Sequence, residues 1–309
     1  MKTKIVYVLS LSDQGCFYEM FLLSVLSLRL HTPKCEVIVV LDKDSLHMIS
    51  DRTETILDGV TMVGIDIPSE YQGYYGSRYL KTQLRNLVSG DFLYLDTDTI
   101  IAEDLSEIDD VQADIAAVTD GNGPKELWNK NVAAVCRKCG IDNPEAKPYF
   151  NGGVLFVKDT PAAYAFFERW HAGWQSMIKA SNGLDQMALL SASIQLGYPI
   201  KELPGIWNCQ ILSSVAINYF HQAKIIHYFS NGDFVDRVVI PHIKKNGGLG
   251  PEAQKLAENP RGYGYNIYRH RKMNPLFLGW SELLFACRTH PGIFIFLKSL
   301  SNLAARSFK

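Results

Sequence analysis

Two hydrophobic spacings alternate along the N-terminal part of the chain. Short, nearly continuous apolar runs such as Glu36 to Leu41 are typical of parallel strands that are buried on both faces. Between these runs, apolar residues such as Phe21, Val25 and Leu28 recur three and four positions apart, which predicts helices. The alternation predicts a doubly wound α/β fold with a mostly parallel central sheet. The expected elements are strands at 4–10, 36–41 and 60–65 and helices at 17–30 and 44–57.

The alternation continues through the middle of the chain and then loosens. We expect Ser77 to cap a helix that runs from Arg78 to about Val88. The glycine-rich stretch from Asn246 to Pro251 predicts a linker, with a main domain at 1–240 and an extension at 241–309. Further elements are expected as strands at 92–95, 150–157 and 225–226, a helix at 161–178, and two short amphipathic helices in the extension, one over 277–287 and one after Pro291.

Length and composition allow one large α/β domain, because 47% of the 309 residues are hydrophobic. This composition excludes a disordered protein, and the formal net charge of −1 gives no support to nucleic-acid binding. The charge is uneven, since Arg261 to Lys309 holds eight Lys or Arg and one acid, Glu282, which leaves about +7 there. We expect this basic tail either to contact an anionic membrane surface or to pack on the domain as a helical extension.

Cysteine usage and the first residues favour a cytoplasmic location. Six cysteines are scattered over a long chain, which suits free thiols in a reducing compartment. The first apolar run is short and Asp13 follows it early, so we expect a strand there and not a signal peptide. Cys136 and Cys139 have a metal-like spacing, but no second pair follows at a zinc-site distance. The expected location is therefore the cytoplasm, with the tail as a peripheral contact on the inner face of the membrane.

A pair of acidic residues, Asp96 and Asp98, follows the strand predicted at 92–95. Side chains alternate along an extended chain, so both carboxylates point the same way. Open α/β sheets bind ligands at the carboxyl ends of their strands, and paired carboxylates suit a hard divalent cation. Such an ion can hold a diphosphate and neutralise the charge that grows on it as it leaves. The alternative is a turn rich in Asp and Thr that caps the next helix.

The segment Phe-Leu-Tyr-Leu-Asp-Thr-Asp-Thr-Ile at 92–100 resembles the metal-binding motif of the GT-A glycosyltransferases, particularly glycosyltransferase family 8. Four more segments resemble motifs of that family in the expected order, so the resemblance covers about residues 4–230. It implies a Rossmann-like GT-A fold and a retaining transferase that moves a sugar from a UDP-sugar to a saccharide or lipid-linked acceptor, as in polysaccharide synthesis. The four segments are Phe150-Asn-Gly-Gly-Val154, Leu184-Asp-Gln186, Leu203-Pro-Gly-Ile-Trp-Asn208 and Ile225-Ile-His-Tyr-Phe229.

The resemblance also implies residue roles. It makes Asp96, Asp98 and His227 the ligands of Mn²⁺ or Mg²⁺, with Asp96 also reaching the donor ribose. The sugar pocket is expected to contain Asn151, Asp185 and Gln186, with Asp185 binding donor hydroxyls and Gln186 near the reacting carbon. Nucleotide contacts are expected from Leu9, Ser10, Thr97, and either Phe17 or Tyr18 as a ring that stacks on the base.

A basic helical face and one altered motif complete the expected donor site. Arg78, Lys81 and Arg85 share one face of a helix, and we expect one of them, preferentially Arg78, to reach the diphosphate. The alternative is a solvated basic face. Family members often carry H-F-x-G-x-x-K-P-W, whose Lys contacts the diphosphate, whereas the segment from His227 to Phe234 has no Lys. Arg78 or Lys81 is therefore expected to replace it.

Two other protein classes remain open at this point. A phosphatase of the haloacid-dehalogenase type also uses D-x-D after an apolar strand, although Ile100 stands where that class usually has Thr or Val. A non-catalytic relative that only binds sugar nucleotides is the other alternative. Hydrolysis of generic phosphate esters would indicate the phosphatase, and nucleotide binding without donor hydrolysis would indicate the non-catalytic relative.

Overall fold

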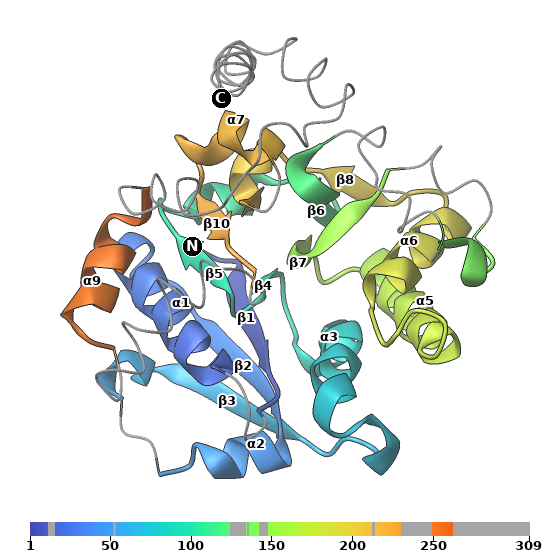
Figure 1. Cartoon of the computed structure of the whole chain (residues 1–309), viewed down its shortest axis with the longest axis horizontal. Helices are drawn as coiled ribbons and strands as arrows, with labels where there is room; N and C mark the ends of the chain where they lie inside the picture. The colour runs from blue at the N-terminus through green and yellow to red at the C-terminus, as the bar shows by residue number, and fades with distance from the viewer. Residues whose placement is uncertain are drawn as a thin grey trace, which may run out of the picture.

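A computed structural model describes residues 1–11, 16–51, 54–123, 134, 136–141, 148–211, 214–229 and 249–261 of the chain. These residues form a mixed α/β fold with a central sheet and helices on both of its faces (Figure 1). The strands are β1 (Lys4–Leu9), β2 (Val37–Asp42), β3 (Val60–Ile65), β4 (Phe92–Leu95), β5 (Thr99–Ile101), β6 (Ile115–Thr119), β7 (Phe150–Val157), β8 (Ile200–Glu202), β9 (Cys209–Gln210) and β10 (Ile225–His227). The α-helices are α1 (Phe17–His31), α2 (Lys43–Met48), α3 (Gly76–Leu87), α5 (Pro161–Met177), α6 (Gln186–Gln195), α7 (Ile217–Phe220) and α9 (Pro251–Glu258).

The central sheet has seven strands in the order β3-β2-β1-β4-β7-β6-β8. The pairs among β3, β2, β1 and β4 are parallel, and so is the pair of β6 with β8. β7 is antiparallel to both of its neighbours, β4 and β6. The sheet is therefore mostly parallel, as the sequence predicts, and the carboxyl ends of β1, β2 and β4 lie along one edge.

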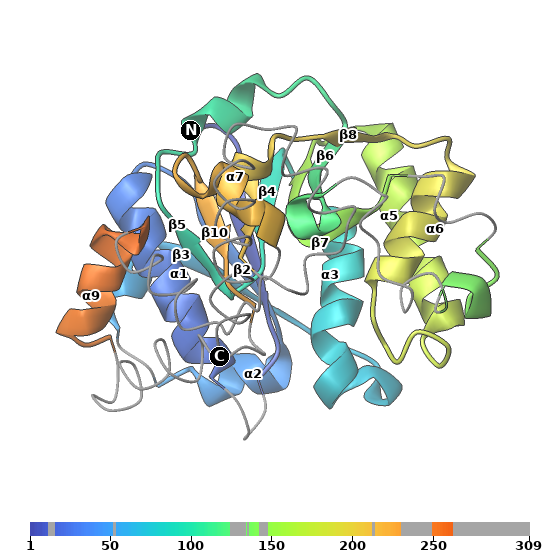
Figure 2. The same ribbon diagram turned by 45° about the horizontal axis from the view of Figure 1, so that its top comes forward.

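Alternate residues of the central strands build two cores, one on each face of the sheet. On one face, Tyr7 of β1 packs with Phe21 and Leu28 of α1. On the other, Val6 of the same strand packs in a cluster with Leu80 of α3. Burial on both faces explains why these strands are almost continuously apolar. Figure 2 shows α1 on one side of the sheet and α3 and α5 on the other.

Two helices differ from the sequence prediction. The helix expected over 44–57 ends at Met48, and a separate 3-10 turn covers Thr55–Leu57. The helix expected to begin after a Ser77 cap instead starts at Gly76, with Tyr75 in the cap position. The prediction for Ser77 is therefore wrong, and its hydroxyl accepts a hydrogen bond from Arg78. A helix cap depends on where the preceding loop meets the helix, which residue type alone does not specify.

A second, three-stranded sheet, β5-β10-β9, lies beside the central one. Its core is shared with α1 and with α9, which contributes Leu256 and Ala257. His31 Nε2 of α1 lies 3.1 Å from the Ala257 carbonyl oxygen, and Arg261 forms an ion pair with Glu103 at 2.6 Å. Helix α9 was not predicted, and it begins at Pro251, the last residue of the expected linker.

Several predictions fall on residues outside the described ranges. The domain boundary at 240 and the two tail helices lie there, as do Cys287 and the segment 230–234. Among the five described cysteines there is no disulfide, so Cys16, Cys35, Cys136, Cys139 and Cys209 are free thiols. Within the part of the chain that the structure describes, every helix is too short or too polar to cross a membrane.

Candidate active site

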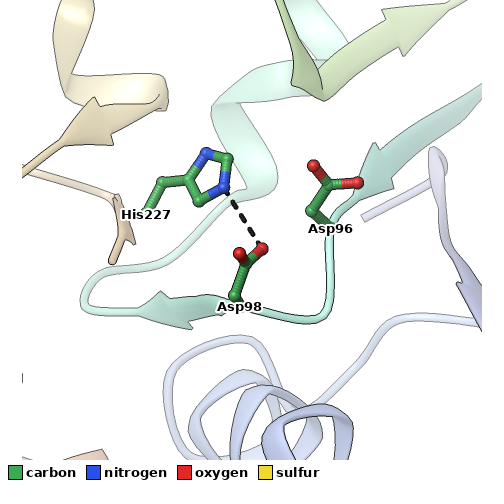
Figure 3. Close-up of side chains that lie close together, drawn as sticks. All are labelled: Asp96, Asp98 and His227. Carbon is green, nitrogen blue, oxygen red and sulfur yellow. Dashed lines mark ion pairs between the residues drawn. The ribbon is translucent and has the colours of Figure 1, made fainter. Parts of the chain in front are cut away.

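The three expected metal ligands come from two segments that are far apart in the sequence. Asp96 and Asp98 lie in the turn between β4 and β5. His227 ends β10, which pairs antiparallel with β5 and sets His227 opposite Thr99. One ligand atom from each of Asp96, Asp98 and His227 lies within 4.8 Å of the others (Figure 3). Strand pairing thus builds a cluster of two carboxylates and one imidazole, a donor set that suits Mn²⁺ or Mg²⁺.

The electrostatics of this cluster favour a cation. His227 Nε2 lies 3.2 Å from Asp98 Oδ1, and the imidazole is almost completely buried. Burial lowers the pKa of His227, but the carboxylates of Asp98 and Asp96 together outweigh it, so the net shift is upward. Two acidic side chains on one buried imidazole therefore leave an excess of negative charge, which a divalent ion would neutralise.

Gly153 of β7 leaves room for two of the three ligands, His227 and Asp96. A Cβ atom at Gly153 would lie 2.4 Å from His227 Cε1 and 2.7 Å from Asp96 Oδ2, both closer than real Cβ contacts. The carbonyl oxygen of Gly153 also accepts a hydrogen bond of 2.7 Å from the Asp96 backbone N–H. This glycine keeps the space around the ligand atoms open, which supports the fit of the site to a metal ion.

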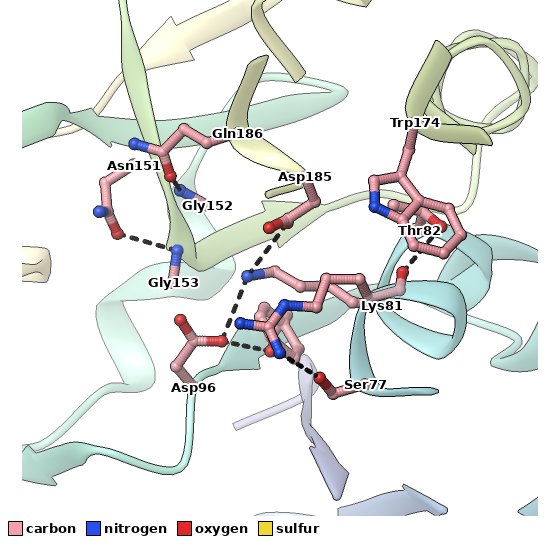
Figure 4. Close-up of polar contacts among 12 residues, drawn as sticks. Ser77, Lys81, Thr82, Asp96, Asn151, Gly152, Gly153, Trp174, Asp185 and Gln186 are labelled. Carbon is pink, nitrogen blue, oxygen red and sulfur yellow. Dashed lines mark hydrogen bonds and ion pairs between the residues drawn. The ribbon is translucent and has the colours of Figure 1, made fainter. Parts of the chain in front are cut away.

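Lys81 of α3 joins the metal-ligand cluster to the expected sugar pocket. Its Nζ lies 3.2 Å from Asp96 Oδ1 and 3.5 Å from Asp185 Oδ2 (Figure 4). Burial lowers the pKa of Lys81, but the carboxylates of Asp185 and Asp96 outweigh it and the net shift is upward. Lys81 is therefore a fixed positive charge between two carboxylates. The hydroxyl of Tyr94 donates a short hydrogen bond to the same Asp96 oxygen.

Two of the three expected sugar-pocket residues, Asn151 and Gln186, meet at Asp120, which follows β6. The side-chain amides of Asn151 and Gln186 each donate to Asp120 Oδ1 at 2.9 Å. Asp185 stands at the cap position of α6 but makes no side-chain cap hydrogen bond, and its carboxylate faces Lys81 instead. The structure therefore brings Asp185 and Gln186 to the same region as the metal-ligand cluster.

The expected nucleotide contacts lie at the carboxyl end of β1, and they differ in exposure. The Leu9 side chain is buried in the core. Ser10 is half-buried beside Gly76, where a Cβ would lie 2.6 Å from Ser10 Oγ. Tyr18 is buried against Phe21 and donates a hydrogen bond of 2.9 Å to Glu54 Oε2.

The alternative aromatic residue, Phe17, is 40% exposed. Of the two rings considered, only Phe17 presents a substantial face to the solvent. Thr97 is half-buried in the turn between the two aspartates.

The basic face of α3 separates into two environments. Arg78 is half-buried near the start of the helix, whereas Arg85 is fully buried near its end. The Arg85 guanidinium donates to the carbonyl oxygens of Val88, Gly90 and Lys158 and contacts the Phe92 ring. Arg85 thus stabilises the turn before β4 and is not a donor contact. Helical spacing predicted the shared face but not the turn that covers its far end.

Sequence reasoning missed two polar residues of this region. No local sequence pattern marks Asp120, because it meets Asn151 only when β6 and β7 pair. Asn208 lies within the quoted segment 203–208 but received no role. Its side chain is buried and lies 3.1 Å from His227 Nδ1 and 3.0 Å from Asn151 Oδ1.

A family model described as glycosyl transferase family 8 matches residues 71–234, more than half of the chain. Three solved structures share the fold. The galactosyltransferase LgtC, in complex with donor and acceptor sugar analogs, has a TM-score of 0.52 at 11% identity over 83% of this chain and 95% of its own. The bifunctional glycosyltransferase WbbM has a TM-score of 0.52 at 14% identity over 87% of this chain and 51% of its own.

The third structure, mouse xyloside xylosyltransferase 1, has a TM-score of 0.50 at 14% identity over 74% of this chain and 98% of its own. At such identities the likeness to each structure shows the fold alone. No curated protein matches the chain.

Proposed function

Because the chain belongs to glycosyl transferase family 8 and is a glycosyltransferase with a GT-A fold, we propose that it is a metal-dependent, retaining enzyme. Its donor is a nucleotide-diphospho-sugar, for which we propose a UDP-sugar, and its acceptor is a saccharide or a lipid-linked saccharide. The family membership removes the phosphatase as an alternative, and the donor-hydrolysis assay below tests the non-catalytic relative. The observation that carries the metal dependence is the cluster of Asp96, Asp98 and His227 within 4.8 Å.

The metal site is proposed at that cluster. Two carboxylates and one imidazole would hold Mn²⁺ or Mg²⁺ and leave coordination positions for diphosphate oxygens. When bound, the ion neutralises the charge that develops on the leaving diphosphate. The space that Gly153 leaves open beside two of these ligands supports this assignment.

The donor diphosphate is proposed to lie between this cluster and α3. Lys81 already faces Asp96, so it is placed to contact a phosphate oxygen bound at the same carboxylate. Arg78, one turn earlier on α3, is the second candidate contact. Lys81 or Arg78 would take over the contact for which the altered motif at 227–234 offers no Lys. Asp96 and Thr97 are proposed to contact the ribose and the phosphates.

The nucleotide base is proposed to bind at the carboxyl end of β1. The backbone of Leu9 and the hydroxyl of Ser10 are the candidate polar contacts there. Phe17 is the preferred stacking ring, because Tyr18 is buried in the core and bonded to Glu54.

The transferred sugar is proposed to occupy the space beside Asp185 and Gln186. Asp185 would accept hydrogen bonds from donor hydroxyls, with Lys81 holding its carboxylate in place. In front-face transfer, the bond from the anomeric carbon to the phosphate oxygen breaks and its electron pair stays on the diphosphate. The acceptor hydroxyl forms the new bond on the same face and gives its proton to that phosphate oxygen. Gln186 would lie beside the reacting carbon.

Ligand-dependent unfolding tests the proposal directly. Mn²⁺ with UDP at about 100 times its Kd is expected to stabilise the wild type by about 2.7 kcal/mol. Asp98→Asn removes one ligand charge and is expected to lose that stabilisation, whereas the exposed Asp110→Asn is expected to keep it. Donor hydrolysis over a panel of UDP-, GDP- and CDP-sugars then identifies the nucleotide. Unchanged Mn²⁺-dependent UDP binding in Asp98→Asn would contradict the metal assignment.

A further inference from the structure

A chain of side-chain amides leads away from His227 into the protein interior. His227 Nδ1 lies 3.1 Å from Asn208 Oδ1, and Asn208 Nδ2 donates to Asn151 Oδ1 at 3.0 Å. Asn151 Nδ2 in turn donates to Asp120 Oδ1 at 2.9 Å. His227, Asn208 and Asn151 are all buried, so water does not compete for these bonds.

Two contacts of Asn151, with Gly153 and with Asp120, fix the orientation of every amide in this chain. Asn151 Oδ1 also accepts a hydrogen bond of 2.8 Å from the Gly153 backbone N–H, which can only donate. A carboxylate of Asp120 can only accept, so Asn151 must present its NH₂ to Asp120 and its oxygen to Asn208.

The remaining orientations follow from this one. Asn208 must therefore donate to Asn151 through its NH₂ and turn its own oxygen toward His227. An amide oxygen only accepts, so Nδ1 of His227 carries the hydrogen, and in the uncharged ring Nε2 carries the lone pair. Nε2 is the nitrogen that faces Asp98 Oδ1 at 3.2 Å. A lone pair and a carboxylate oxygen that face each other at this distance leave a position that suits a cation.

The plane of the imidazole is fixed by a second contact. The Phe229 ring stacks on His227 with centroids 4.0 Å apart and planes 10° apart. Phe229 has a φ of 59°, a left-handed conformation that is uncommon for a bulky residue and costs about 1–3 kcal/mol. This backbone conformation places the ring two residues after His227 back over the imidazole. The stacking contact offsets the strain and restricts rotation of the metal ligand.

We propose that Asn208 and Phe229 are positioning residues that hold His227 in one tautomer and one plane, so that Nε2 is presented ready-made to the metal ion. The proposal rests on the metal-dependent function above. It also gives Asn151 a role other than the expected sugar contact, because Asp120, Asn208 and Gly153 already occupy the NH₂ group and the oxygen of its amide. Ligand orientation by partners of this kind typically changes metal affinity by about 10- to 100-fold when it is lost.

Asn208→Leu is the sharpest test, with Gln210→Met as its matched control. Gln210 lies two residues on, is equally buried and bonds the backbone of Thr119 and Gly121 instead of His227. Each variant removes a buried side-chain amide from the segment 208–210, so both are expected to lower the melting temperature. Only Asn208→Leu is expected to weaken Mn²⁺ binding, by about 10-fold or more.

Binding of Mn²⁺ alone is measured by electron paramagnetic resonance of the free ion, and the nitrogen coupling of bound Mn²⁺ reports on His227. Phe229→Leu keeps an apolar side chain and leaves the chain of side-chain amides intact. It is expected to weaken Mn²⁺ binding as well. This variant tests the proposal even where Asn208→Leu does not fold. The proposal is overturned if wild type binds Mn²⁺ and both variants bind it equally well with the same nitrogen coupling. A wild type that binds no Mn²⁺ overturns the proposed function itself, and the positioning role with it.

Discussion

Gly153 shows how one absent side chain decides the geometry of the site. It lies on β7, yet its Cα is close enough to two metal-ligand candidates that a Cβ would clash with both. The neighbouring Gly152 is different, because a Cβ there would meet only ordinary contacts, the nearest being Lys81 Nζ at 3.5 Å. Two adjacent glycines of one strand therefore carry unequal constraints.

Gly153→Ala is expected to displace His227 or Asp96 and to weaken Mn²⁺ binding by at least about 10-fold, the range seen when metal ligands lose their orientation. Gly152→Ala is the control and is expected to bind Mn²⁺ as the wild type does. Calorimetric titration with Mn²⁺ measures both. Equal affinity in the two variants would show that the ligands do not need the space at Gly153.

Lys81 is the other residue on which the site depends. It balances the charge of Asp96 and Asp185 inside a half-buried cluster. Lys81→Met keeps most of the apolar stem but leaves these carboxylates without their cation. We expect donor hydrolysis to fall by about 100-fold, since a lost charge contact of about 2.7 kcal/mol corresponds to that factor. Hydrolysis rates at saturating Mn²⁺ test this, and Lys43→Met, an exposed lysine paired with Asp66, is the control.

At the scale of elements, His171 joins α5 to the helix that carries Lys81. Its Nδ1 lies 2.7 Å from Thr82 Oγ1 and its Nε2 lies 3.0 Å from Gln83 Nε2. The Gln83 amide donates, so His171 Nε2 accepts, which requires an uncharged ring. Burial lowers the pKa of His171 below its usual value of 6.5. The contact between α3 and α5 therefore depends on a neutral imidazole.

This contact gives a pH dependence of stability with a defined sign. The unfolded chain takes up a proton at His171 near pH 6.5, whereas the folded protein does so only at lower pH. The stabilisation is therefore complete above about pH 6.5 and falls as the pH decreases toward the lower, folded-state pKa. His171→Gln cannot titrate, so its melting temperature is expected to change less than that of the wild type between pH 7.5 and 5.5. Parallel curves for the two proteins would contradict the expectation.

Helix α9 bears on where the catalytic unit ends. It lies beyond the predicted boundary at 240, yet Leu256 is buried in the cluster that includes α1. We propose that the unit extends through Arg261. Leu256→Ala is expected to lower the free energy of unfolding by about 2–4 kcal/mol. Lys255→Ala changes an exposed neighbour and is expected to have little effect, as denaturant unfolding of both variants would show.

For the whole molecule, the predictable part of the fold is the part coded by local patterns. The runs at 92–95 and 150–157 are buried on both faces, so their composition alone identified them as strands. The aspartates after β4 could be placed at the sheet edge for the same reason. Their meeting with His227 requires β5 and β10 to pair across more than 120 residues, which no local pattern reports. The family resemblance supplied that contact.

Other misses have the same physical origin. Arg85 repeats at helical spacing with Arg78, but the turn at 88–90 covers it and converts it into a structural residue. The helix predicted at 44–57 ends early at Met48. Gly64 of β3 packs against Leu46 of this helix, and a Cβ atom at Gly64 would lie 2.6 Å from Leu46 Cδ2. Periodicity indicates which residues share one face of a helix, but tertiary packing determines which parts of the protein contact that face.

The uneven charge of the whole chain leads to a test of membrane contact. Residues 261–309 hold eight basic residues and one acid, while the rest of the chain is acidic overall. We propose that this tail brings the enzyme to an anionic membrane surface, where each basic residue near the surface contributes about 1 kcal/mol.

A chain that ends at Arg261 keeps the ion pair with Glu103 and is expected to retain donor hydrolysis. Its partition onto vesicles rich in anionic lipid is expected to fall at least about 10-fold, because removing even two such contacts exceeds 1.4 kcal/mol. Neutral vesicles are the control, and added salt should reduce the wild-type binding since screening weakens surface charge attraction. Equal sedimentation of the two proteins with anionic vesicles would show that the tail packs elsewhere.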